Sequence, residues 1–237
     1  STAAAIDSVD KALFFEDQGA SVLYLPEFIN RYFPLLAQIR KRTRAELVLL
    51  ANVGCLLQCP IRQYHINLVS HSNESAELGT YVDYPLMWCT REKAADAGQM
   101  LKSPWIRPED MSIYEEIGID QFKLGGREMD RGWVERAANA YAARRYDGDL
   151  NDLILGFDHL EPYGRVPVRI PNRALDGFVE FFRKKHDCRI GCRDCRYCDD
   201  YARERAQVET ARDGFVARVE RAIAKFEGGA FRTASGR

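Results

Sequence analysis

Apolar residues recur at two spacings along the first fifty residues, which predicts alternating helices and strands. Residues 5–19 place apolar side chains three or four positions apart, which predicts a helix that ends at Gly19. Residues 21–26 form a short apolar run typical of a buried strand. A second helix is predicted over 27–43, and a second buried strand over 46–52.

The alternation resumes after a stretch that the pattern marks as irregular, from residue 54 to about residue 101. A short strand is expected around Trp105, followed by a helix that ends at Gly118. Residues 119–124 predict a strand, and residues 133–146 predict a further helix. Strands and helices joined by short links favour βα units with a parallel sheet and right-handed crossovers.

About four such units are visible, which sets the predicted fold class as α/β. A (βα) barrel needs eight strands, so the sequence indicates either an open sheet or a partial (βα) barrel whose N-terminal strands are missing. The remainder of the chain differs, with an Asp-, Gly- and Pro-rich stretch, four close cysteines and a long helix over 208–226. We therefore expect a partial barrel over 1–150 and a Cys-rich, metal-binding C-terminal module with a terminal helix over 151–237.

Composition narrows the class of protein without naming a function. The chain has 237 residues, of which 46% are hydrophobic and 29% charged, and its net charge is −1. This balance is typical of a globular protein, and it does not favour a general polyanion binder. No apolar run approaches the roughly 18 residues of a membrane span, and no secretory signal is visible at the start. We expect a cytoplasmic, reducing location, where stable disulfides are uncommon.

Four of the seven cysteines lie within eleven residues, in the pattern C-x3-C-x2-C-x2-C. These residues are Cys188, Cys192, Cys195 and Cys198. Such close spacing lets a short stretch of backbone direct several thiolates at one point, as a zinc ion or a 4Fe-4S iron–sulfur cluster requires. We predict a metal site, with the spacing leaving zinc and iron–sulfur both open; incidental free thiols are the plainer alternative. Basic neighbours could offset the charge of a cluster or contact an RNA backbone.

A second group of polar residues follows the predicted strand over 46–52. In parallel α/β folds, sites form in the loops beyond the carboxyl ends of the strands. The candidates at this strand end are Asn52, Cys55, Cys59, Arg62, His65 and His71. Cys55 and Cys59 could form a second metal site or share one with the C-terminal cysteines. Cys89 stands alone and is interpreted as a small buried hydrophobe.

Two further strand ends carry cations. Lys123 and Arg127 flank a Gly-Gly turn that lets the backbone approach a ligand closely. Arg107 follows the strand expected around Trp105. Guanidinium and ammonium groups bind carboxylates and phosphates, so these residues predict a site for an anionic small molecule or a nucleic acid.

Two stretches resemble the collagenase-like peptidase family, peptidase family U32. The stretch GIDQFKLGGREMDRGWVERAANAYAARR, residues 118–145, resembles the family's Lys-Ile-Glu-Gly-Arg segment and the helix after it. Lys123, Gly126 and Arg127 match that segment, whereas Gly125 stands where the family often has Glu. NVGCLLQCPIRQYHINLVSH, residues 52–71, resembles the version found in one subgroup. The resemblance covers most of residues 1–227, as a C-terminal portion of such a protein.

This resemblance implies a (βα) barrel, in agreement with the half-barrel pattern. The family name records protease activity, while several relatives are iron–sulfur proteins of oxygen-independent hydroxylation, acting on a quinone precursor or on RNA bases. It implies as partners a family paralogue or the missing N-terminal half of the barrel. We therefore expect an iron–sulfur enzyme with an anionic substrate; a peptidase and a zinc-stabilised RNA-binding module are the alternatives. Neither Gly-x-Ser-x-Gly nor His-Glu-x-x-His occurs in the chain.

Overall fold

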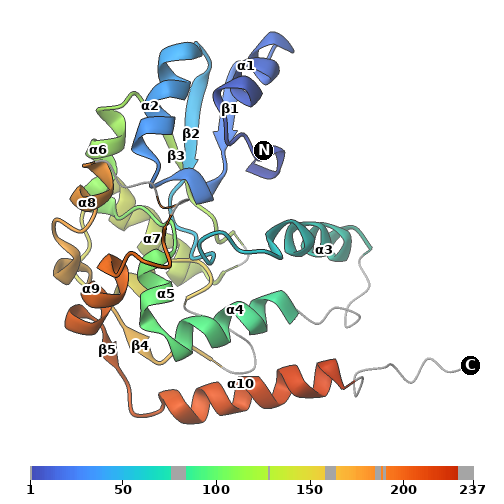
Figure 1. The fold of residues 1–237 in the computed structure, drawn as a ribbon, viewed down its shortest axis with the longest axis vertical. Helices are drawn as coiled ribbons and strands as arrows, with labels where there is room; N and C mark the ends of the chain where they lie inside the picture. The colour runs from blue at the N-terminus through green and yellow to red at the C-terminus, as the bar shows by residue number, and fades with distance from the viewer. Residues whose placement is uncertain are drawn as a thin grey trace, which may run out of the picture.

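Three parallel strands form the centre of the protein. The computed structural model describes residues 2–75, 84–127, 129–157, 164–184, 188 and 191–228. The strands are β1 (Val22–Leu25), β2 (Glu46–Leu50) and β3 (Gln121–Lys123), adjacent in that order (Figure 1). All pairings are parallel, with Leu23 opposite Leu47 and Val48 opposite Gln121. The predictions of strands over 21–26, 46–52 and 119–124 are confirmed. β2 is buried over most of its length, as an apolar run indicates, whereas β3 is largely exposed.

Helix ends agree with their local chemistry. α1 (Val9–Asp17) begins after Ser8, whose hydroxyl accepts a hydrogen bond from the backbone N–H of Lys11 at 3.2 Å. α2 (Phe33–Arg42) ends in three basic residues, which suit the negative pole of the helix dipole. α7 (Arg131–Ala143) begins after Asp130, which caps the N–H of Trp133 at 3.0 Å. These three helices fall where the sequence predicts them.

The expectation of an irregular stretch over 54–101 is wrong. It contains α3 (Arg62–Ser75), α4 (Tyr84–Ala95) and α5 (Ala97–Lys102). The sequence of α4 has no continuous apolar stripe that would predict a helix, because Thr90 and Lys93 occupy buried positions on it. In α3 every side chain whose burial is described is at least partly exposed, and the helix projects sideways from the body (Figure 1). Helical periodicity in the sequence depends on a buried apolar face, and neither helix supplies one.

The strand expected around Trp105 does not form either. Residues 103–107 run extended past the end of β2, where the backbone N–H of Ile106 donates to the carbonyl oxygen of Ala51 at 2.8 Å. The indole N–H of Trp105 donates to the carbonyl oxygen of Met100 at 2.8 Å. The segment is thus buried beside the sheet without forming a ladder. The helix expected after it appears as η3 (Pro108–Asp110) and α6 (Met111–Glu115).

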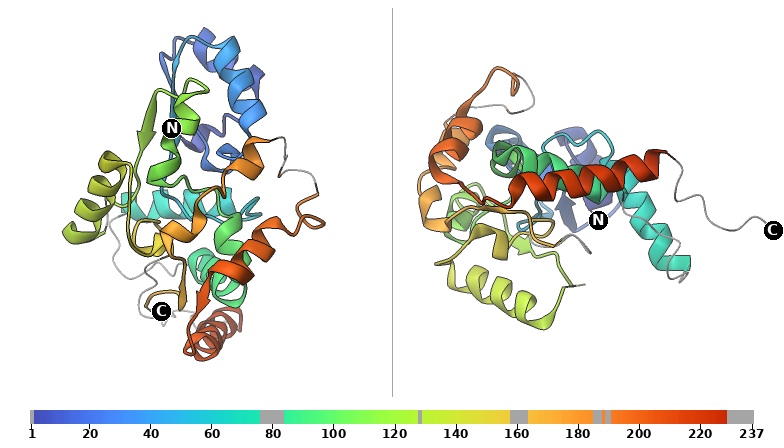
Figure 2. Two further views of the ribbon diagram at one scale, coloured as in Figure 1. Left: turned by 90° about the vertical axis from the view of Figure 1, so that its left-hand side faces the viewer. Right: turned by 90° about the horizontal axis from the view of Figure 1, so that it is seen from below.

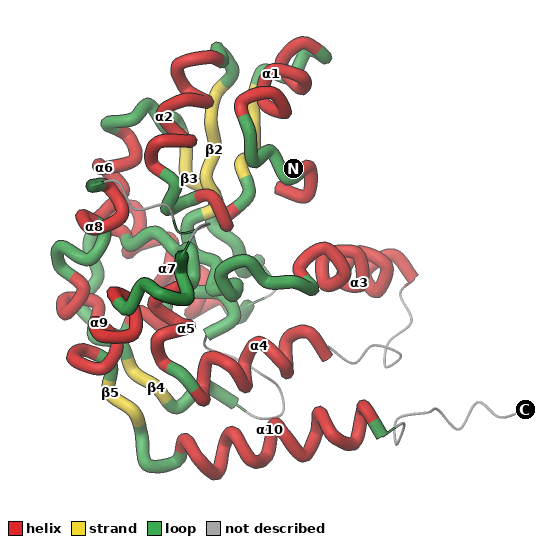
Figure 3. The backbone as a smooth tube through the Cα atoms, viewed as in Figure 1, coloured by secondary structure: helices red, strands yellow, loops and turns green. Residues whose placement is uncertain are grey.

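A further extended segment joins the sheet beyond the end of β2. Val53 and Leu155 form a parallel bridge, and the N–H of Leu155 donates to the carbonyl oxygen of Asn52 at 2.9 Å. The described residues thus make a mixed α/β fold with a three-stranded parallel sheet and many helices (Figure 3). The barrel interpretation stays a prediction.

The C-terminal part packs on the same core. It contains η4 (Leu150–Asp152), β4 (Val168–Arg169), η5 (Asn172–Leu175), α8 (Glu180–Arg183), α9 (Tyr197–Arg205), β5 (Gln207–Val208) and α10 (Arg212–Glu227). β4 and β5 pair antiparallel. The predicted long C-terminal helix is confirmed as α10, which runs alongside α4 (Figures 1 and 2). There the rings of Tyr84 and Phe226 stack with centroids 5.0 Å apart. One hydrophobic cluster extends across residue 150, from Leu49 to Phe178 and Val219.

No helix in the described ranges is both long and apolar enough to span a membrane.

Gly126 provides a test of how tightly the end of β3 is packed. Its φ is +105°, and an added Cβ would lie 2.2 Å from Cζ3 of Trp133. Gly177 also has a positive φ, +78°, but an added Cβ would have no neighbour within 4 Å. We expect Gly126→Ala to lower the free energy of unfolding by about 3 kcal/mol and Gly177→Ala by about 1 kcal/mol. Urea denaturation measures both, and equal losses would contradict the close packing of Gly126 on Trp133.

Candidate functional site

The carboxyl edge of the sheet gathers three loops, and Asn52 ties them together. Its side-chain N–H groups donate to the carbonyl oxygens of Gly125 at 3.1 Å and Leu153 at 3.2 Å. Its side-chain oxygen accepts from the N–H of Gly125 at 2.7 Å. Asn52 is fully buried, so its polar atoms serve the backbone. The sequence proposed it as a substrate-binding residue, and the structure gives it a structural role.

Arg62 is likewise engaged by the protein. Its guanidinium donates to both carboxylate oxygens of Glu27, at 2.5 and 2.8 Å, and lies over the ring of Phe28. Burial opposes the charge, but the hydrogen bonds and negative charge of Glu27 outweigh it and raise the pKa of Arg62. The pair fastens the start of α3 to the loop after β1. Arg62 therefore has its charge balanced within the protein, in place of the predicted contact with an anionic substrate.

Arg107 is a third candidate whose guanidinium is engaged within the protein. It is 2% exposed. It donates twice to Asp110, at 3.0 Å each, and to Asp176 and the carbonyl oxygen of Asn172 at 3.0 and 2.7 Å. These bonds join η3 to the segment around η5. The strand-end cations that remain exposed are Lys123, whose ammonium lies 5.5 Å from the centroid of Tyr24, and Arg127.

The two histidine candidates both lie on α3. His65 is half-buried in the first turn of that helix, where its backbone N–H donates to the carbonyl oxygen of Ile61 at 2.9 Å. His71 belongs to the same helix, but its side chain lies outside the described part of the structure.

Three thiols gather near the end of β2, and we call Cys55, Cys59 and Cys89 the strand-end thiols. Burial is the main cause that raises the pKa of Cys55 to about 12, and the charges of Glu27 and Cys89 add to it. Burial also raises the pKa of Cys59, with a contribution from Cys89. Cys89, interpreted from the sequence as an isolated hydrophobe, is thus a neighbour of the other two. One feature of the sequence could have indicated this site: Cys89 lies four residues, about one helical turn, before Lys93 on α4.

Lys93 is the cation of this group. It is 1% exposed, and its ammonium donates to the carbonyl oxygen of Gly156 at 3.0 Å and contacts Cys89 Sγ at 3.6 Å. The ammonium also lies 5.2 Å from the ring centroid of Phe157. No carboxylate pairs with Lys93 in the residues that the structure describes. A buried lysine beside thiols favours any species in which those thiols carry negative charge.

The C-terminal cysteines Cys188, Cys192, Cys195 and Cys198 form a second group, the thiol quartet. Cys188 and Cys198 are buried, and the other two are half-buried. Burial chiefly raises the pKa of Cys198 to about 12; the three other thiols raise it further, and Arg31 lowers it. The four thiols are therefore electrostatic neighbours. No disulfide joins any two of the seven cysteines, all of which lie in the described ranges.

The quartet is attached to the sheet edge at two places. Gln58, which lies between Cys55 and Cys59 in the sequence, donates from its side chain to the carbonyl oxygen of Cys188 at 3.4 Å. Lys102 at the end of α5 pairs with Asp199 in the first turn of α9 at 2.6 Å. The loop of the strand-end thiols is therefore in contact with the quartet segment. From the sequence, a site shared by the two groups of cysteines was one of two alternatives.

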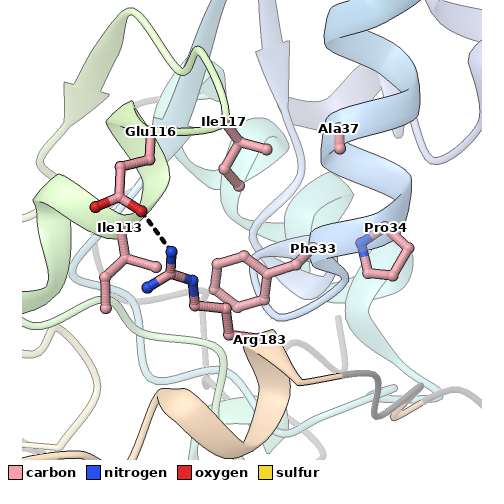
Figure 4. Close-up of a pocket in the computed structure, with 7 residues that line it drawn as sticks. All are labelled: Phe33, Pro34, Ala37, Ile113, Glu116, Ile117 and Arg183. Atoms are coloured by element: carbon pink, nitrogen blue, oxygen red, sulfur yellow. Dashed lines mark hydrogen bonds and ion pairs between the residues drawn. The ribbon is translucent and has the colours of Figure 1, made fainter.

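In the described ranges, no three Cys, His, Asp or Glu side chains converge closely enough to hold a metal ion. An open groove of about 350 Å³ lies on the outer surface between α2, α6 and α8 (Figure 4). Arg183 and Glu116 pair across it at 2.5 Å. The remaining lining residues are Phe33, Pro34, Ala37, Ile113 and Ile117. None of them is a candidate from the sequence, so the candidate site stays at the sheet edge.

These features define a thiol-rich α/β protein whose polar loops meet at the carboxyl edge of a parallel sheet. The chain is 34% identical over 206 residues to the "Uncharacterized protease MJ1657" of Methanocaldococcus jannaschii, a match that covers 87% of this chain. No model of a known protein family and no solved structure matches it. The match and the resemblance over 118–145 show that the chain belongs to the U32 peptidase family. It spans 59% of the length of this relative.

The buried ion pair at the start of α3 can be tested by a double-mutant cycle. Arg62→Met leaves the carboxylate of Glu27, which is 3% exposed, without its partner. We expect this change to lower the free energy of unfolding by about 3 kcal/mol. Adding Glu27→Gln removes the unpaired charge and should recover about half of the loss. Denaturant unfolding of the four proteins gives the coupling, and simple additivity of the two losses would contradict a buried, paired contact.

Proposed function

We propose that this chain is an iron–sulfur enzyme of the U32 family that acts on an anionic substrate, of the oxygen-independent hydroxylase type. The observation that supports the proposal is the contact between the two cysteine-bearing segments of the chain. The quartet contributes four closely spaced cysteines, and the Gln58–Cys188 contact joins its segment to the loop of the strand-end thiols. A quinone precursor and an RNA base are the substrate classes that the family resemblance suggests.

The donor chemistry of the quartet fits such a centre. Thiolates are the ligands that iron–sulfur clusters and structural zinc ions share, and four of them complete either set. Metal binding displaces the thiol protons, and burial raises the pKa of Cys192 and Cys198, so metal affinity would depend on pH. An iron–sulfur centre would supply one-electron redox chemistry at this edge of the sheet. In this proposal Cys188, Cys192, Cys195 and Cys198 are its ligands, and the strand-end thiols are a second set.

The exposed cations of the β3 end support an anionic substrate. Lys123 and Arg127 are exposed, whereas Arg62 and Arg107 are neutralised by carboxylates within the protein. Gly126 between them adopts a positive φ, and its neighbour Gly125 contacts Asn52 through its backbone. A backbone without side chains lets a ligand approach closely, and the two cations would orient its carboxylate or phosphate groups.

A peptidase is the second candidate, because the relative is named a protease. One contact favours it: the ammonium of Lys93 lies 3.6 Å from Cys89 Sγ. A thiol beside a basic side chain is the minimal pair for nucleophilic catalysis. Since Lys93 is 1% exposed, a peptide bond would have to reach a buried pair. The burial of Lys93 therefore argues against hydrolysis at this pair.

Metal analysis of protein purified without air tests the proposal. We expect about four irons and matching sulfide per chain. Cys198→Ala should lose most of the iron, because it removes one of the two buried thiols of the quartet. The matched variant Cys89→Ala leaves the quartet intact and should keep the iron that the quartet binds.

Two other results would each overturn this reading. A colourless protein with one zinc per chain would favour the zinc-stabilised RNA-binding module. Peptide cleavage that survives both chelation and Cys198→Ala but is abolished by Cys89→Ala would favour the peptidase.

A further inference from the structure

Cys89 and Lys93 form a contact pair on one face of α4. They are four positions apart, so their side chains lie next to each other on the helix. Nζ of Lys93 donates to Sγ of Cys89 at 3.6 Å. The thiol itself donates to the carbonyl oxygen of Leu86 at 3.3 Å, which directs its proton away from Lys93 and leaves a lone pair of the sulfur facing Nζ. A nucleophilic nitrogen and an oxidisable sulfur are therefore in direct contact.

The protein holds the nitrogen of this pair in a fixed position. The side chain of Lys93 is 1% exposed, and Nζ donates to the carbonyl oxygen of Gly156 at 3.0 Å. Nζ also lies 5.2 Å from the ring centroid of Phe157. In the part of the chain that the structure describes, no carboxylate forms an ion pair with Lys93, whereas Arg62 holds Glu27. The nitrogen of Lys93 is thus not engaged by an opposite charge, and the sulfur of Cys89 is one of its few contacts.

The sulfur is easier to reach than the nitrogen. Cys89 is half-buried, whereas Lys93 is almost completely enclosed. A peptide is too large to reach such a pair, but a peroxide is little larger than water and can reach the sulfur. Thiols beside a basic side chain and accessible to solvent are the ones that peroxides oxidise most readily. The geometry therefore suits oxidation at the sulfur better than hydrolysis of a peptide.

We infer that Cys89 and Lys93 form a covalent sulfenamide cross-link when a peroxide oxidises Cys89. First, the Cys89 thiolate attacks the peroxide: an S–O bond forms, the O–O bond breaks, and the released hydroxide takes a proton from the Lys93 ammonium and leaves as water. Second, the lone pair of the resulting amine attacks the sulfenic acid sulfur: an S–N bond forms, the S–O bond breaks, and the hydroxide leaves as water with a proton from Nζ. The sulfur loses two electrons in total, and the peroxide gains them.

The position of Nζ decides what becomes of the sulfenic acid. A sulfenic acid next to a nucleophile condenses with it reversibly, whereas an isolated one is oxidised further to irreversible acids. The flexible four-carbon stem of Lys93 lets Nζ close the remaining distance without a change in the backbone of α4. The cross-link would protect Cys89 from further oxidation, and it would remove the positive charge beside the strand-end thiols. This inference does not depend on a metal in the quartet.

Peptide mapping after peroxide treatment tests the inference. The chain is purified without air, treated with hydrogen peroxide, blocked at its remaining thiols and digested with trypsin. We expect the peptide that ends at Arg91 to be joined to the one that begins at Glu92, with two hydrogens lost and no cleavage after Lys93. A thiol reductant should separate the two peptides and restore Cys89 and Lys93.

Three variants identify the bond. Lys93→Met and Lys93→Arg both remove the amine, and Lys93→Arg keeps the positive charge. In both, the cross-link should be lost and Cys89 should be found as sulfinic acid. Urea denaturation before peroxide treatment checks that these variants are folded. Cys59→Ser removes a neighbouring thiol and should leave the cross-link unchanged.

Three results would overturn the inference. The first is that the unaltered chain yields Cys89 as sulfinic acid with Lys93 unmodified. The second is that Cys89 is recovered in a disulfide with another cysteine, which would identify a thiol as its partner. The third is that the same loss of two hydrogens persists in folded Lys93→Arg.

Discussion

The buried amide of Asn52 is the contact on which the arrangement of the candidate site depends. Three segments leave the sheet at its carboxyl edge, and hydrogen bonds from this one side chain fix two of them against the third. Parallel strands that are buried on both faces place their polar loops at their ends. Once these ends are held together, the residues after β2 and β3 and the segment at Leu153 have to share one small region. Cys55 and Arg127 lie at one edge for this reason.

Charge balance then separates the basic residues of this edge into two kinds. Arg62 and Arg107 have carboxylate partners and act as cross-links between loops. Arg31 and Lys93 are also buried and have no carboxylate partner among the described residues, and the ammonium of Lys93 lies 3.6 Å from Cys89 Sγ. A buried, unbalanced charge is costly, whereas the same charge beside a thiolate-bound metal is stabilising. This asymmetry is the physical link between the fold and the proposed metal chemistry.

The sequence predicts the sheet better than the site. Residues 46–52 are recognisable because the buried β2 requires an apolar run, and 21–26 contains the two buried leucines of β1. α4 is missed because Lys93 and Thr90 occupy buried positions on it, which breaks the apolar pattern. Cys89 is missed because thirty residues separate it from Cys59, and only the fold brings the two together. The carboxylate partners of Arg62 and Arg107 could not be predicted, because a sequence shows the cation without showing which carboxylate the fold places beside it.

The central claim is that thiolates of this chain surround a metal. X-ray absorption at the iron and zinc edges, on chain isolated without air, tests it most directly. The account predicts a bound metal whose nearest neighbours are sulfur atoms at about 2.3 Å. A metal surrounded by nitrogen and oxygen alone, or no bound metal, would contradict it.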